Sequence, residues 1–242
     1  MAALALAWLT GILLLLPQEA LAAPPDLAAR AAAWPDWQLP APLQQPGQSD
    51  LVYPDWLAGE WQRCPAGPSD PCQRLRFRRD NRERVVGDRA FNALMAGRAV
   101  LGEDLLSVST DPANPNRQLA RLRGEVRLES SVIGRASRNL PAGRFLCDEL
   151  ALQVLHPPPA AGGDGTAPRV SRVETLTRLT PTPVDGESGA GGVAGPVQTV
   201  LVEQWQATYP SPSEGLAAVA MRSEHESFTL ERLTSEPGPG PA

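Results

Sequence analysis

The sequence has 242 residues and a formal net charge of −5, and arginine supplies all 22 of its basic residues. The absence of lysine excludes Schiff-base enzymes and P-loop nucleotide-binding proteins, because both need a lysine side chain. A mildly acidic chain also lacks the basic surface that usually accompanies nucleic-acid binding, so no nucleic-acid partner is expected.

Residues 1–22 have the pattern of a signal peptide. An apolar stretch runs from Ala3 to Leu16 and ends at Pro17, and Ala20-Leu21-Ala22 matches the small-x-small pattern of a cleavage site. The stretch is short for a membrane span, so the pattern predicts export, with membrane association that is peripheral at most. No arginine precedes the apolar stretch, and a retained N-terminal anchor is therefore the alternative.

Residues 23–50 are rich in Ala, Pro and Gln and show no periodicity, which predicts an extended leader rather than a domain. The leader contains WPDW at positions 34–37, and YPDW follows at positions 53–56. In each copy, proline fixes φ and aspartate can cap a short turn that presents a tryptophan. We expect the second turn to cover the closed end of a barrel. The first could fold back over a barrel mouth or an apolar patch, the alternative being a disordered leader with two incidental tryptophans.

Cys64 and Cys72 bracket the turn-forming sequence PAGPSDP. Because an exported chain meets an oxidising compartment, a local disulfide between them is predicted. Cys147 would then be a buried free thiol, and three unpaired core thiols are the alternative. The following segment, RLRFRRDNRER at positions 74–84, predicts either a solvated strand face or a surface that docks on acidic lipid headgroups or an acidic partner.

The segment GDRAFNALMAGRAVLG has helical spacing, and Asp88 is a natural N-cap, so one short helix is predicted over residues 89–101. Its candidate ligand contacts are Arg89, Phe91, Asn92 and Met95, which could line or cover a cavity. Ordinary packing of the helix against a barrel is the alternative. The sequence STDPANPNRQ that follows is rich in turn-forming residues and predicts a turn.

From residue 120 onward the segments alternate with period two, which predicts strands. A hairpin turn is expected near Gly124, and the Gly- and Pro-rich stretches near 157–168 and 181–196 are expected to be disordered loops. With residues 235–242 as a disordered tail, residues 51–234 form a single domain of eight or nine strands. Mostly antiparallel strands around one core predict a closed barrel or a sandwich, and the single domain favours the barrel.

The sequence WLAGEW places Gly59 and Trp61 in a Gly-x-Trp motif at the first strand, and Arg232 lies in the last. This arrangement resembles lipocalin-type (calycin-type) proteins. The resemblance implies that Trp61 closes one end of a β-barrel and stacks beneath Arg232, a contact of about 1–2 kcal/mol when it is desolvated. The other tryptophans, Trp34, Trp37, Trp56 and Trp205, are candidate contacts for a ligand or partner.

The segments YPDWLAGEW, DRAFN, DPANPNRQ and VETLT also resemble an uncharacterised family of cyanobacterial and plastid proteins, over residues 34–233. This resemblance implies a location in the thylakoid lumen or the periplasm and implies no activity.

The sequence offers little for catalysis. It has two histidines and no Cys-x-x-Cys or Gly-x-Ser-x-Gly motif, so we expect no catalytic residue, no metal and no cofactor. We therefore expect a non-enzymatic, exported, lipocalin-like protein that binds an apolar small molecule such as a lipid, isoprenoid or pigment. The alternative is an assembly or stability factor that docks on a thylakoid membrane complex, and an enzyme is a distant third.

Overall fold

The computed structural model describes residues 26–64, 72–158, 167–182 and 197–233. The predicted signal peptide and the tail lie outside the described residues, as do most of the two predicted loops. At the second loop, Pro181 and Thr182 belong to a strand, so that boundary of the prediction was wrong.

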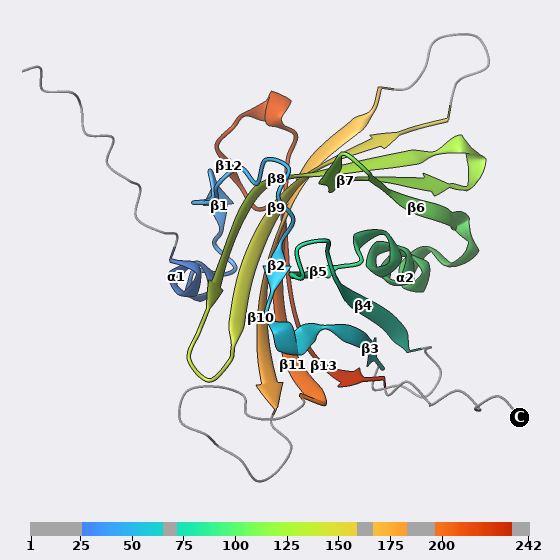
Figure 1. Ribbon diagram of the computed structural model, residues 1–242. Coiled ribbons are helices and arrows are strands. Elements are labelled where there is room, and N and C mark those ends of the chain that lie inside the picture. Colours follow the sequence, from blue (N-terminus) through green and yellow to red (C-terminus); the bar gives the residue numbers. More distant parts are fainter. Residues whose placement is uncertain (1–25, 65–71, 159–166, 183–196, 234–242) are drawn as a thin grey trace, which may run out of the picture.

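Eleven strands form one antiparallel sheet in the order β2-β5-β4-β3-β13-β11-β10-β9-β8-β7-β6, and β1 pairs with β12 separately (Figure 1). The prediction of a mainly antiparallel β protein is confirmed, although it missed strands of two or three residues, which are too short to show an alternation. The predicted closed barrel is not confirmed, because the sheet is a half-barrel whose end strands, β2 and β6, do not pair with each other. The strands are β1 Gln38–Leu39, β2 Val52–Tyr53, β3 Gly59–Arg63, β4 Gln73–Arg79, β5 Val85–Gly87, β6 Leu105–Asp111, β7 Asn114–Leu122, β8 Arg127–Asn139, β9 Phe145–His156, β10 Arg169–Thr182, β11 Thr199–Tyr209, β12 Ala218–Val219 and β13 Arg222–Arg232.

Helix α2 spans Arg89–Leu101, as predicted, and the side chain of Asp88 caps it by accepting a hydrogen bond from the backbone N–H of Phe91. The helix contacts both β4 and β6, which stand near opposite ends of the strand order. The sheet is therefore curled around the helix (Figure 1). The expected turn near Gly124 is present: a 3-10 turn with Gly124 at φ 73° joins β7 to β8. The turn predicted for STDPANPNRQ is confined to residues 112–113, and the rest of that segment belongs to β6 and β7. The short 3-10 helices are η1 Asp55–Leu57, η2 Gly102–Asp104, η3 Arg123–Glu125 and η4 Pro212–Glu214.

The sheet has a buried apolar cluster on each face. Leu146 belongs to one cluster and Cys147 to the other, and successive residues of a strand point to opposite faces. The face that carries Cys147 also carries Trp61 and Phe77, and we call it the inner face. The face that carries Leu146, Leu176 and Trp205 is the outer face.

Residues 26–53 form a strap that runs from the outer face to the inner face, and its WPDW segment folds back over an apolar patch, which is one of the arrangements expected for it. Helix α1, Leu27–Ala32, and Trp37 pack into the outer cluster, and Trp37 is fully buried. The strap then passes the edge of β8, where Gln44 and Arg135 exchange backbone hydrogen bonds. It ends in β2, whose neighbour Leu51 belongs to the inner cluster. Apolar side chains anchor the strap at both ends, which is why a Pro-rich segment without periodicity is ordered.

The strap also brings an arginine to a buried carboxylate on β10. Arg30 of α1 donates from Nε and Nη2 to the two carboxylate oxygens of Glu174, at 2.8 and 2.6 Å, and the Tyr209 hydroxyl donates to Glu174 at 2.6 Å. Two charged residues of β10, Arg172 and Glu174, are both buried: the strap covers Glu174, and Arg172 donates to three carbonyls of residues 210–216.

Asp148 lies fully buried near this pair and makes no hydrogen bond within the described residues. Burial, together with the negative charge of Glu174, raises its pKa well above the ordinary value of 3.8. At acid pH Asp148 is neutral in both the folded and the unfolded chain. As the pH rises above 3.8, only the unfolded chain ionises, so the free energy of unfolding falls until the pH reaches the folded pKa.

We expect the substitution Asp148→Asn to stabilise the protein at neutral pH. It should also remove the fall in the free energy of unfolding that the ionisation of Asp148 in the unfolded chain causes as the pH rises. Urea unfolding of both proteins across the acid-to-neutral range measures the difference. Glu149→Gln provides the contrast: the charges of Arg89 and Arg135 outweigh burial and lower the pKa of Glu149, so its contribution is lost as the pH falls. If the wild-type protein and the Asp148→Asn variant showed parallel pH profiles, Asp148 would not be the group that titrates.

Candidate ligand-binding groove

The structure brings Gly59, Trp61 and Arg232 together at one end of the inner face. The guanidinium of Arg232 lies 4.3 Å from the centre of the fully buried Trp61 ring, on strands β13 and β3. It donates to the carbonyls of Trp56, Ala58 and Val197 at 2.6, 2.6 and 2.7 Å. Gly59 has φ +124°, and a Cβ there would lie 2.7 Å from Nη1 of Arg232. The positive φ and the close approach of the Arg232 guanidinium both require a residue without a Cβ, so the motif needs glycine at position 59.

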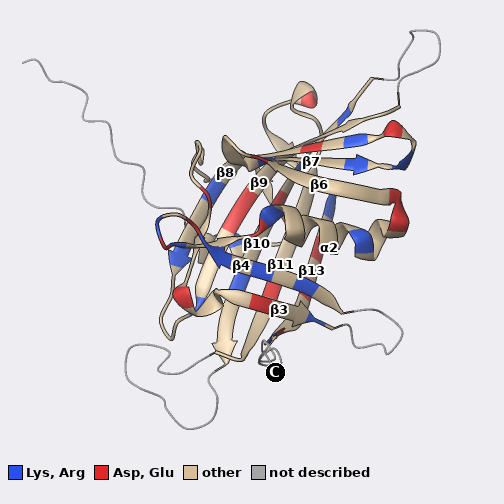
Figure 2. Ribbon diagram, turned by 45° about the vertical axis from the view of Figure 1, so that its right-hand side comes forward, with Lys and Arg blue, Asp and Glu red and all other residues tan. Residues whose placement is uncertain are grey.

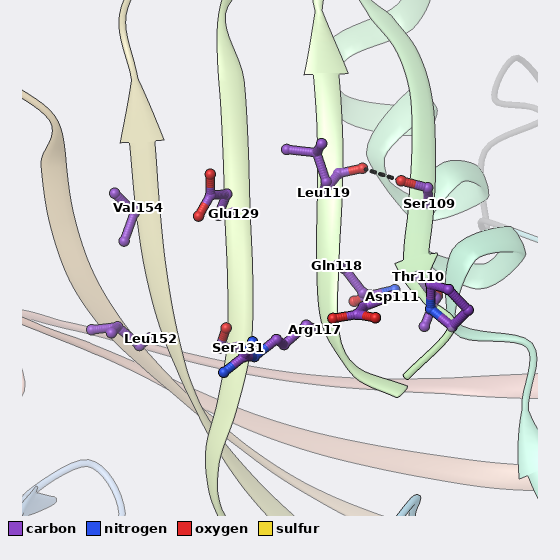
Figure 3. A pocket seen from close by; sticks show the side chains of 11 residues that line it. Ser109, Thr110, Asp111, Arg117, Gln118, Leu119, Glu129, Ser131, Leu152 and Val154 are labelled. Atoms are coloured by element: carbon purple, nitrogen blue, oxygen red, sulfur yellow. Dashed lines mark hydrogen bonds between the residues drawn. The ribbon is translucent and has the colours of Figure 1, made fainter. Parts of the chain in front are cut away.

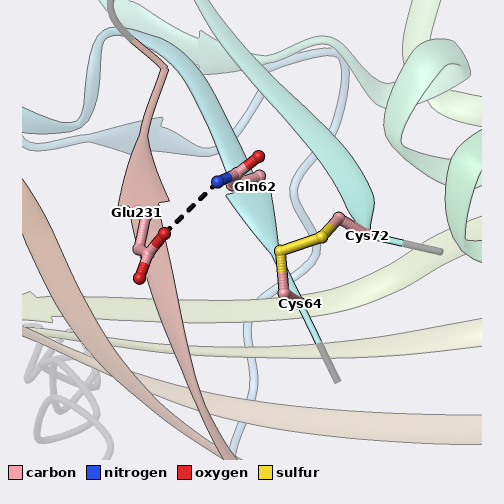
Figure 4. Close-up of a disulfide and its surroundings, with 4 residues drawn as sticks. All are labelled: Gln62, Cys64, Cys72 and Glu231. Atoms are coloured by element: carbon pink, nitrogen blue, oxygen red, sulfur yellow. Dashed lines mark hydrogen bonds between the residues drawn. A yellow bond between two sulfur atoms is a disulfide. The ribbon is translucent and has the colours of Figure 1, made fainter. Parts of the chain in front are cut away.

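A disulfide joins Cys64 to Cys72 and links the end of β3 to the start of β4 (Figure 4). Nearby, the Gln62 amide donates to Glu231 at 3.2 Å and ties β3 to β13. Cys147 is a buried free thiol whose pKa is raised by burial and by the negative charges of Glu149 and Asp148. A thiol in that state is neither nucleophilic nor a metal ligand, so it contributes packing.

The candidate contacts on α2 take part mainly in interactions within the chain. Arg89 donates to Asp50 at 2.7 Å and to Glu149 at 2.8 Å, and it lines a cavity of about 170 Å³ together with Asn92. The Asn92 side chain also hydrogen-bonds the backbone of Arg76 on β4 in both directions. Phe91 lies 4.2 Å from the guanidinium of Arg76. Met95 is half-buried.

The candidate tryptophans also pack within the fold. Trp37 is buried under the strap, and Trp34 lies against His225, which stacks on Trp205 with ring centres 5.0 Å apart. Trp56 donates from Nε1 to the carbonyl of Gly143 at 3.1 Å. The structure therefore brings Trp34, Trp37 and Trp205 together on the outer face, with Trp56 apart from them.

The arginine row of β4 is largely paired with acids of the same chain. Figure 2 shows this basic strand beside β3. Arg74 and Arg76 pair with Glu60, and Arg79 pairs with Asp55 at 3.0 Å. These pairs leave the row less net charge for an acidic membrane or partner than the sequence alone indicates.

An open groove of about 570 Å³ lies on the outer face over strands β6 to β9 (Figure 3). Its apolar members are the half-buried Leu119, Leu152 and Val154 and the exposed Pro112. The polar side chains that surround them are Ser109, Thr110, Asp111, Arg117, Gln118, Glu129 and Ser131. The volume lies within the range typical of small-molecule sites, about 300–1,000 Å³.

The groove exists because the strap covers only part of the outer face. Along β9 the outward residues Leu146 and Asp148 are buried beneath the strap, whereas Leu152 and Val154, farther along the same strand, remain partly exposed. Register places Val154 beside Glu129 of β8, which faces Leu119 of β7. Three strands therefore present their apolar and polar side chains to one open surface.

None of the residues predicted for ligand contact lines this groove. Two of them, Arg89 and Asn92, line the separate cavity of about 170 Å³ instead. Sequence reasoning did not single out Leu119, Leu152 or Val154, or Arg117 beside them, as ligand contacts. The available signal was the pattern Arg-x-Leu-x-Arg at 117–121, where an apolar residue sits between two charges on one strand face. Only the register with β8 and β9 shows what lies beside it.

Among the described residues no cluster of three or more His, Cys, Asp or Glu side chains could hold a metal ion. In the same part of the chain, no helix has the length and apolar character needed to cross a membrane. A family model described as a domain of unknown function (DUF6816) matches residues 73–234. Neither the curated proteins nor the solved structures contain a match.

Proposed function

Since the chain belongs to the DUF6816 family, whose function is unknown, we propose from the structure that it is a non-enzymatic protein that binds a small molecule with an apolar body. The observation that carries the proposal is the outer-face groove, where Leu119, Leu152 and Val154 lie uncovered within a polar rim. Concave surfaces with an apolar floor and a few polar groups are the usual form of small-molecule sites.

The stacking of Arg232 on Trp61 supports a lipocalin-like arrangement, although the proposed ligand lies on the outer face and not within a barrel. The inner face supports this location, because its apolar cluster is buried and the cavity that Arg89 lines beside it has a volume of about 170 Å³, below the range of about 300–1,000 Å³ typical of small-molecule sites. As part of the same proposal, the protein is exported and acts in the thylakoid lumen or the periplasm.

We expect N-phenyl-1-naphthylamine, a neutral apolar dye, to bind the purified protein with a rise in fluorescence. The substitutions Leu152→Gln and Leu119→Gln should weaken this binding by roughly tenfold each, because each removes apolar area worth about 1–2 kcal/mol. Leu201→Gln on β11 is the matched control, since Leu201 is also exposed (41%) but lies outside the groove. Native mass spectrometry of protein purified from its source would then identify what occupies the groove.

The second candidate function is an interaction protein that docks on a membrane complex. The observation in its favour is the exposure of Val100, Leu101 and Leu106 at the end of α2 and the start of β6, where Val100 is 84% exposed. The dye experiment decides between the two functions. A protein that fails to bind the dye, or three variants that all bind it like the wild type, would refute the groove as a ligand site and favour the docking function.

A further inference from the structure

Two arginines face each other at one end of the outer-face groove. Arg121 of β7 and Arg127 of β8 are direct cross-strand partners, and both are exposed. Like charges placed opposite each other weaken a sheet, so this pair does not help the fold. The ion pairs in this corner of the described chain join Arg123 to Asp104 and His156 to Glu129, and neither includes Arg121 or Arg127.

The arginine pair opens onto apolar surface. Both arginines line a hollow of about 480 Å³ together with Leu106, Leu122 and Val126, and one acidic residue, Glu125, lines it as well. This hollow lies next along β7 and β8 from the groove that contains Leu119, because Arg121 and Leu119 are two residues apart on one strand and share a face.

The side chains of the outer face lie in three rows across β7, β8 and β9. The first row is Arg121, Arg127 and His156, the second is Leu119, Glu129 and Val154, and the third is Arg117, Ser131 and Leu152. Four residue steps separate the first row from the third, a distance of about 13 Å at the rise of a β-strand. The surface therefore offers a cationic end and, beyond it, the apolar side chains of Leu119, Val154 and Leu152, which share their rows with Glu129 and Arg117.

Resting on the proposed function, we infer that the ligand is a single-chain amphiphile with a carboxylate headgroup. Arg121 and Arg127 hold the carboxylate, because guanidinium groups donate paired hydrogen bonds to its two oxygens. The bound anion also removes the repulsion between the two arginines. The apolar chain then lies along Leu119, Val154 and Leu152.

The test compares headgroups on one chain length. Dodecanoate, 1-dodecanol and dodecyltrimethylammonium compete with N-phenyl-1-naphthylamine for the intact protein. We expect dodecanoate to displace the dye at a concentration roughly tenfold below that of dodecanol, since charge-assisted hydrogen bonds distinguish them. The cationic amphiphile should be the weakest, and added salt should reduce the preference for dodecanoate.

In the double variant Arg121→Gln/Arg127→Gln, dodecanoate and dodecanol should displace the dye equally. Arg138→Gln is the control, because Arg138 is an exposed arginine at the other end of β8. Both substituted side chains are exposed and their like charges are removed, so the thermal midpoint of the double variant should be at least that of the wild type. Two outcomes would overturn the headgroup assignment while the dye still binds in the groove. One is equal displacement of the dye by dodecanoate and dodecanol in the wild type, and the other is a preference for dodecanoate that survives in the double variant. If the wild-type protein does not bind the dye at all, the proposed function is refuted and this inference with it.

Discussion

Replacing Trp61 with alanine is expected to lower the free energy of unfolding by about 3–5 kcal/mol, the range for truncating a large buried aromatic side chain. The Trp61 ring is fully buried, and Arg232 covers it while holding the carbonyls of Trp56, Ala58 and Val197. Without the ring, the guanidinium loses the surface that orients it. Chemical denaturation of the wild type and the variant measures the loss.

A double-mutant cycle with Arg232→Ala separates the stacking contact from simple loss of volume. We expect the two substitutions to be less damaging together than the sum of the single effects, because each removes the same contact. Trp34→Phe is the control, since Trp34 is only half-buried and keeps an aromatic ring in this variant. Additive effects in the cycle would show that Trp61 and Arg232 stabilise the fold independently.

Removing the charge of Arg30 is the second large effect that we expect. Arg30→Ala leaves the fully buried carboxyl group of Glu174 without its cationic partner, and breaking a buried pair in this way costs about 3–5 kcal/mol. The strap should also detach from the outer face, because Arg30 makes its polar contact with that face. Protease cleavage between residues 26 and 44 should then become faster.

Arg63→Ala is the matched control for this prediction. Arg63 also forms a close pair, with Glu226 at 2.7 Å, but both side chains are substantially exposed. Surface pairs of this kind contribute about 0–1 kcal/mol. If Arg30→Ala were no more destabilising than Arg63→Ala, the strap would be held by its apolar contacts alone.

The strap and the groove are related by the geometry of the outer face. The strap buries the outward side chains of β9 near Leu146 and leaves those near Leu152 uncovered. A strap that covered the whole face would remove the groove, and a chain without the strap would expose Trp205 and Leu176 as well. The outer face is therefore divided into a covered part that stabilises the fold and an open part that we assign to the ligand.

Local signals in the sequence predicted much of the fold. Helix α2 was predicted with its bounds because its apolar spacing and the Asp88 cap act within a few residues. The turn at Gly124 was visible because glycine readily adopts a positive φ. The Gly-x-Trp motif named Trp61 and Arg232, which are far apart in sequence, but it did so through a resemblance and not through the residues themselves.

The sequence by itself determined that this chain is an antiparallel β protein with one helix of known bounds, because alternation, capping and turn chemistry are properties of neighbouring residues. Only the tertiary structure decided that a Pro-rich segment is an ordered strap, that Glu174 lies buried beneath it, and that Leu119, Leu152 and Val154 share an uncovered groove. The physical reason is the same in each case. A period of two reveals which residues share a strand face, but strand order, register and the segment that covers each face determine whether that face is buried or open.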